Sequence, residues 1–78
     1  MIVVHVVEDH AGNELSREEL TVAANSEREF EAWLDDARAG FAVSGVDLPH
    51  KERYWARTAQ VPLLTHYWWA ASPFDQWT

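Results

Sequence analysis

The sequence predicts an α+β domain in which one amphipathic helix packs on one face of a small antiparallel β-sheet of three or four strands. Three observations lead to this fold class. Apolar β-branched residues open the chain, a central stretch has helical periodicity, and a strand-like stretch rich in aromatic residues lies near the end. This order of elements is typical of a sheet covered by a helix. With 78 residues, the chain is expected to form one domain over 1–78.

The first strand is predicted at residues 2–7. This stretch, Ile-Val-Val-His-Val-Val, is apolar at alternate positions on both sides, as in a strand that is covered on both faces. His5, alone on an apolar face, is expected to be a core residue with a hydrogen-bond partner rather than a metal ligand. Polar residues and Gly12 in 8–13 then predict a reversal of the chain.

Residues 14–25 allow two interpretations. Ser16 and Glu19 can form the capping box of a short helix. Alternation of apolar and polar residues favours instead a strand over about 18–24. We expect the strand, paired antiparallel with the first one through a loop that is longer than a tight hairpin.

Residues 26–40 carry the clearest helical signal. Ser26 can cap the first turn while Glu29 reaches back, and Gly40 can adopt the left-handed conformation that ends a helix. Apolar residues with helical spacing form one stripe, which consists of Phe30, Trp33, Leu34, Ala37 and Phe41. We expect this stripe to lie on the sheet with Trp33 at its centre.

The second half of the chain is less regular. Residues 42–52 contain a glycine and a proline and are expected to be a connection, while 53–60 can form either a short helix or an edge strand. Residues 61–69 have strand composition, and Pro62 places their beginning at a sheet edge or at the start of a strand. Residues 70–78 are expected to be an irregular tail.

Charge limits the class of partner. The chain has 13 acidic and 6 basic residues, with a formal net charge of −7. Nucleic acids and anionic membranes are polyanions, so direct binding to either is disfavoured and a basic protein partner is favoured. The opening residues lack the basic segment of a secretion signal, and no apolar run approaches the ~20 residues of a membrane span. We therefore expect a cytoplasmic protein.

Enzymatic and metal chemistry is not expected. The absence of cysteine excludes disulfides, thiol nucleophiles and cysteine zinc sites. The histidines near acidic residues, in 8–10 and 50–52, lack the spacing of metal ligands, so no cofactor is predicted. The serines lack a nucleophile motif, and the three glycines form no phosphate-binding loop.

Acidic residues on the central helix are unusually placed. Glu27, Glu31 and Asp35 follow one another at intervals of four, and each such like-charge pair costs roughly 0.2–0.5 kcal/mol. Asp35 and Asp36 also lie near the C-terminal end, where the helix dipole is negative. These four residues form either an ordinary solvated face or a docking surface for a basic partner.

Aromatic residues are the second notable feature, with five Trp, two Tyr and three Phe in the chain. Five of these aromatic rings lie in 66–69 and 74–77. They can complete the core, because so short a chain needs to bury most of its large apolar side chains. Alternatively, Trp68 or Trp77 stays partly exposed and anchors an interface, since tryptophan is enriched at binding hot spots. Base stacking is disfavoured because no basic groove accompanies the rings.

The combined observations predict a small acidic interaction protein without enzymatic activity. In size, acidity and lack of cysteine, the chain is similar to acidic inhibitors of nucleic-acid-handling proteins, including anti-CRISPR proteins and some antitoxins; the similarity is one of composition. The predicted partner-binding residues are Glu27, Glu31, Asp35, Asp36, Trp68 and Trp77. In the alternative interpretation, the protein is a homo-oligomeric structural module whose aromatic residues in 70–78 pack against a second copy. The chain is accordingly expected to be a monomer or a homodimer.

Overall fold

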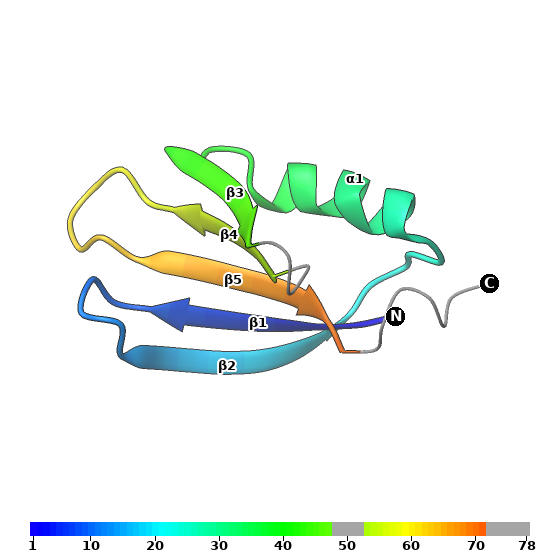
Figure 1. The fold of residues 1–78 in the computed structure, drawn as a ribbon, viewed down its shortest axis with the longest axis horizontal. Helices are drawn as coiled ribbons and strands as arrows, with labels where there is room; N and C mark the ends of the chain where they lie inside the picture. Colours follow the sequence, from blue (N-terminus) through cyan, green and yellow to red (C-terminus); the bar gives the residue numbers. More distant parts are fainter. Residues whose placement is uncertain (48–52, 72–78) are drawn as a thin grey trace.

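A computed structural model describes residues 1–47 and 53–71, which form a five-stranded antiparallel sheet and one helix (Figure 1). The strand order across the sheet is β2-β1-β5-β4-β3. The predicted α+β class is confirmed, and the strands number five rather than three or four. In chain order the elements are β1 (Ile2–Glu8), β2 (Glu14–Thr21), α1 (Glu27–Ala37), β3 (Val43–Asp47), β4 (Arg53–Arg57) and β5 (Thr65–Ala70).

Strand β1 lies inside the sheet, between β2 and β5. It pairs with β5 in an antiparallel register that places Val3 opposite Ala70 and Val6 opposite Tyr67, so the two ends of the described chain meet. Val3 and Val6 point to opposite faces, yet both are buried, with 0% and 2% exposure. The prediction of a strand covered on both faces is confirmed.

Strand β2 pairs antiparallel with β1, which confirms the strand interpretation and rejects the short helix. It begins four residues earlier than predicted, because the loop before it is closed by the carboxylate of Asp9. One oxygen of Asp9 accepts hydrogen bonds from the backbone N–H groups of Ala11 and Asn13, each at 2.9 Å. Gly12 supplies the positive φ of 88° that the reversal requires.

Helix α1 begins as predicted. The Ser26 hydroxyl accepts the Glu29 N–H at 3.1 Å, and the Glu29 carboxylate accepts the N–H of Asn25 at 2.8 Å. The return contact of the capping box is therefore made one residue before the cap. The helix ends at Ala37, and Gly40, with φ of 92°, serves the turn into β3 instead of closing the helix.

The core lies between α1 and one face of the sheet. Phe30 and Leu34 are 0% exposed, and the Phe30 ring meets the Tyr54 ring edge-on at 5.5 Å. Trp33 is only partly buried at the margin of this cluster, so the prediction that it forms the centre of the stripe is wrong. The helix is rotated so that Phe30 and Leu34 point at the sheet and Trp33 covers its flank. The other fully or largely buried members of the cluster are Val3, Val22, Ala24, Ala56 and Trp68.

The segment predicted as a connection, 42–52, contains the edge strand β3, so that prediction is wrong over 43–47. Gly45 concealed the strand, because glycine ordinarily weakens strands. Its role here is to make room for the Trp55 indole on the paired strand β4. A Cβ atom at Gly45 would lie 2.8 Å from Cζ2 of Trp55, closer than side-chain carbons approach.

The region predicted as either a helix or an edge strand forms β4, which lies inside the sheet between β3 and β5. Its buried residues Tyr54 and Ala56 face α1. Strand β5 begins at Thr65, four residues later than predicted, because the Thr58 hydroxyl organises the preceding loop. That hydroxyl accepts the Leu64 N–H at 3.0 Å. The predicted tail is described only as far as residue 71; residues 72–78 lie outside the described residues.

Substitution of Leu34 tests how the helix packs on the sheet. Leu34→Ala removes a side chain with 0% exposure and is expected to lower the free energy of unfolding by about 2–5 kcal/mol. Urea unfolding measures the change. Arg28→Ala, on an exposed position of the same helix, is the control and should stay within about 0.5 kcal/mol of the wild type. Equal loss in both variants would contradict the packing described above.

Candidate functional site

The four predicted acidic residues of α1 are all exposed: Glu27, Glu31, Asp35 and Asp36. Phe30 and Leu34 of the same helix are fully buried. Glu27, Glu31 and Asp35 follow one another along the helix at intervals of four, and Asp36 points about 100° away from Asp35. We call these four exposed carboxylates the acidic ridge. The last helical turn carries no basic residue to balance them.

Two residues of the acidic ridge have neighbours that moderate their charge without cancelling it. Glu31 accepts a hydrogen bond from the Tyr54 hydroxyl at 3.3 Å. Burial, followed by the charge of Glu31, raises the pKa of Tyr54 to about 12, so this phenol stays neutral. Asp35 lies 3.6 Å from the Arg38 guanidinium, but its side chain is 79% exposed. Such exposed pairs contribute only about 0–1 kcal/mol.

Arg38 is directed toward the sheet more than toward the acidic ridge. It donates a hydrogen bond to the backbone oxygen of Gly45 at 3.1 Å, and its guanidinium carbon lies 5.6 Å from the centre of the Tyr54 ring. Its side chain is only 16% exposed. The arginine therefore ties the end of α1 to strands β3 and β4.

Trp68 is 4% exposed, so the prediction that it remains partly exposed as an interface anchor is wrong. The His5 ring lies parallel to it at 4.9 Å, and the Phe41 ring meets it edge-on at 6.0 Å. Trp68 belongs to the face of β5 that points toward α1 and joins the buried cluster that contains Phe30 and Leu34. Trp77 lies outside the described residues.

The structure also joins three residues that the sequence analysis did not connect. Nδ1 of His5 lies 2.9 Å from the Glu18 carboxylate, and Nε2 of His5 lies 2.9 Å from Nδ1 of His66. A carboxylate only accepts, so Nδ1 of His5 donates to Glu18, and the contact between Nε2 of His5 and Nδ1 of His66 continues the chain to β5. The expectation that His5 finds a hydrogen-bond partner on its strand face is confirmed. We call this arrangement the Glu18–His5–His66 chain.

Burial, followed by the nearby His5, lowers the pKa of His66 below its ordinary value of 6.5. His66 is therefore neutral at pH 7. Sequence patterns can pair His5 with Glu18 once the β1–β2 register is known, but His66 lies 61 residues from His5. Among residues 1–47 and 53–71, no group of three or more acidic, histidine or cysteine residues is arranged to hold a metal ion.

The face of the sheet that points away from α1 carries a second set of paired residues. Three arginines lie over three aromatic rings at 4.3–5.6 Å, namely Arg17 over Trp69, Arg53 over Tyr67, and Arg57 over Trp55. These are three of the six basic residues of the chain. Because the guanidinium groups cover the rings, a largely aromatic face is given a charged outer layer.

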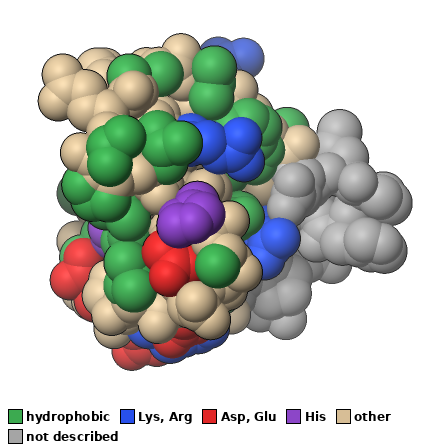
Figure 2. Space-filling view, turned by 90° about the vertical axis from the view of Figure 1, so that its left-hand side faces the viewer, with side chains coloured by type: hydrophobic (Ala, Val, Ile, Leu, Met, Phe, Trp, Pro, Cys, Tyr) green, Lys and Arg blue, Asp and Glu red, His purple; other side chains and the backbone are tan. Residues whose placement is uncertain are grey.

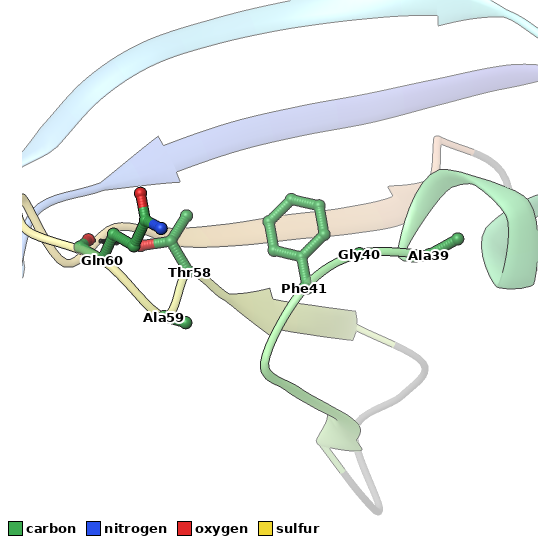
Figure 3. Close-up of a pocket in the computed structure, with 6 residues that line it drawn as sticks. All are labelled: Ala39, Gly40, Phe41, Thr58, Ala59 and Gln60. Carbon is green, nitrogen blue, oxygen red and sulfur yellow. Dashed lines mark hydrogen bonds between the residues drawn. The ribbon is translucent and has the colours of Figure 1, made fainter.

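Two clefts open at the end of the molecule that carries the loops 9–13 and 58–64, where Figure 2 shows apolar, acidic, basic and histidine side chains intermingled. One, of about 390 Å³, lies between the α1–β3 turn and the β4–β5 loop (Figure 3). Phe41 forms part of its wall and packs edge-on against His66 at 4.9 Å. The Thr58 hydroxyl in this cleft is already engaged within its own loop. The other cleft has a volume of about 420 Å³ and lies on the face with the arginines.

Comparison with known proteins finds no matching family model, no matching curated protein and no matching solved structure. In the described part of the chain, no helix is both long enough and apolar enough to cross a membrane.

The lowered pKa of His66 predicts a loss of stability in mild acid. The unfolded chain binds a proton at this ring near pH 6.5, whereas the folded protein resists it until the pH is lower. Protons thus favour unfolding, and the contribution of His66 is complete above this pH and declines below it. We expect the urea midpoint to fall between about pH 7.5 and about pH 5.5, a range in which mainly histidines titrate.

Two variants test whether His66 causes this decline of the urea midpoint. His10→Gln changes an exposed histidine outside the Glu18–His5–His66 chain and should retain the decline. His66→Gln should reduce it, even if the variant is less stable at every pH. An undiminished decline in His66→Gln would show that another group is responsible.

Proposed function

We propose that this protein is a small acidic binding protein without enzymatic activity, which docks its acidic ridge on a basic surface of another protein. A surface that ordinarily contacts nucleic acid is the favoured target, because it presents clustered Lys and Arg side chains. By occupying that surface, the protein would act as an inhibitor, in the manner of anti-CRISPR proteins or antitoxins.

Segregation of charge is the observation that carries this proposal. The acidic ridge consists of exposed residues of α1, which covers one face of the sheet. Arg17, Arg53 and Arg57 lie on the other face of the sheet, over aromatic rings. These three arginines lie on the other face, so Arg28 and Arg38 are the described basic residues in or directly after α1. Complementary charge of this kind steers association and mainly raises the association rate.

The energetic cost of the acidic ridge supports the same interpretation. Asp35 and Asp36 lie in the C-terminal part of α1, where each unfavourable interaction with the helix dipole costs about 0.3–1 kcal/mol. Glu27, Glu31 and Asp35 add like-charge repulsion along the helix. The packing of Phe30 and Leu34 does not require acidic residues at the exposed positions of α1. A role in binding would explain why these positions are acidic.

The spacing of the acidic ridge fits a target that binds phosphate groups. Residues four apart on a helix are separated by about 6 Å along its axis. A row of carboxylates at this interval can meet several cationic side chains of one groove, as a nucleic-acid strand does.

Charge reversal tests the proposal. The variant Glu31→Lys with Asp35→Lys should lose capture of a basic protein from a lysate of the source cells at low salt, because attraction becomes repulsion. Mass spectrometry identifies the captured protein. For the wild type, raising the salt concentration should weaken capture steeply, since exposed charges are screened.

The matched control is Glu14→Lys with Glu19→Lys on β2, which gives the same net charge away from α1. It should retain most of the capture. If both double variants remain folded and capture equally well, or if the captured protein is not basic, the acidic ridge is not the docking surface.

A further inference from the structure

The cleft of about 420 Å³ lies at the loop end of the sheet, on the face away from α1. Its volume is within the range of small-molecule sites, about 300–1,000 Å³. Charged, hydroxyl and aromatic side chains converge on it, and the residues that matter here are Glu8, Asp9, His10, Arg57, Thr65 and Tyr67.

Opposite charges stand on the two sides of this cleft. Glu8 pairs with Thr65 across β1 and β5, and Thr65 pairs with Arg57 across β5 and β4. The three residues therefore form one row across the sheet. The Cα atoms of Glu8 and Arg57 are separated by two strand spacings, which is about 10 Å.

Arg57 is held on its own side of the row. Its Nε–H donates to the Thr65 hydroxyl at 3.2 Å, and its guanidinium carbon lies 5.1 Å from the centre of the Trp55 ring. Among the ion pairs within the described residues, none joins Arg57 to Glu8. The terminal N–H groups of the guanidinium thus remain for a ligand, as does the Glu8 carboxylate.

The second acidic residue in the cleft, Asp9, is used in hydrogen bonds that stabilise its own loop. Asp9 accepts hydrogen bonds from the N–H groups of Ala11 and Asn13 and from the Asn13 side-chain amide, at 2.9–3.2 Å. These bonds hold the pKa of Asp9 below its usual range. Glu8 is therefore the carboxylate that a bound cation would meet.

We infer that this cleft binds a small zwitterion, a free amino acid or a short peptide, with its ammonium group on Glu8 and its carboxylate on Arg57. A guanidinium matches a carboxylate with two parallel hydrogen bonds. The protein carries a net charge of −7, which repels anions but not a zwitterion. The inference does not depend on the acidic ridge, because the cleft lies on the other face of the sheet.

Glycylglycine is a suitable probe, because it carries one ammonium and one carboxylate group. Amide NMR spectra of the whole protein, recorded during titration, should show saturable shifts at residues 8–12, 57 and 65. A ligand this small is expected to bind with a dissociation constant in the millimolar range. N-acetylglycylglycine lacks the ammonium group and glycylglycinamide lacks the carboxylate, so each should bind at least about tenfold more weakly.

Variants then assign the contacts. Glu8→Gln should weaken glycylglycine binding about tenfold or more, whereas Glu19→Gln, which removes the same charge from the same face outside the cleft, should leave it unchanged. Arg57→Lys keeps the charge, loses the paired hydrogen bonds and should weaken binding. The folded state of each variant is checked by circular dichroism.

Several results would overturn the inference. Absence of saturable shifts with glycylglycine would do so, as would equal binding of the acetylated or amidated peptide. Equal effects of Glu8→Gln and Glu19→Gln would show that only the overall charge matters. None of these results bears on capture of a basic protein by the acidic ridge, so the two proposals can fail separately.

Discussion

One helix can cover only one face of a five-stranded sheet, and the rest of the structure follows from how the chain meets this constraint. Phe30 and Leu34 are fully buried between α1 and one face. On the other face, Trp55, Tyr67 and Trp69 would form an apolar surface of the kind that promotes association. Arginines lie over these rings. Their charged groups, which water solvates well, shield the aromatic side chains.

This use of arginine determines the electrostatics of the molecule. Half of the basic residues are engaged with rings on one face, and the acids of α1 lie on the other. Neutralisation across the molecule would need these groups to be close, because exposed charges are screened beyond about 10 Å at ordinary salt. The fold thus converts a modest excess of acidic residues into an acidic surface and a separate face of mixed charge. The two proposed sites belong to these two surfaces.

Polar groups inside so small a domain must be satisfied locally. The Glu18–His5–His66 chain achieves this with two hydrogen bonds of 2.9 Å that span β2, β1 and β5. Unpaired, a buried imidazole would cost about 1–3 kcal/mol. Arg38 is a counterexample, since its Nε atom is buried without a protein partner among the described residues, while its terminal nitrogens reach Gly45 and Asp35.

The sequence by itself determined the helix, its cap at Ser26, the buried strand β1 and the exposure of the acids on the helix, because these depend on residues within a few positions of each other. Only the tertiary structure decided which residues of the chain meet across strands. Position 45 is glycine because the Trp55 indole occupies the space where a Cβ would lie, and Trp68 is buried because the His5 and Phe41 rings pack against it. His5 and His66 meet because β1 and β5 are paired in the sheet. Cross-strand contacts join residues that are far apart in the chain, so the secondary-structure propensities of neighbouring residues do not predict them.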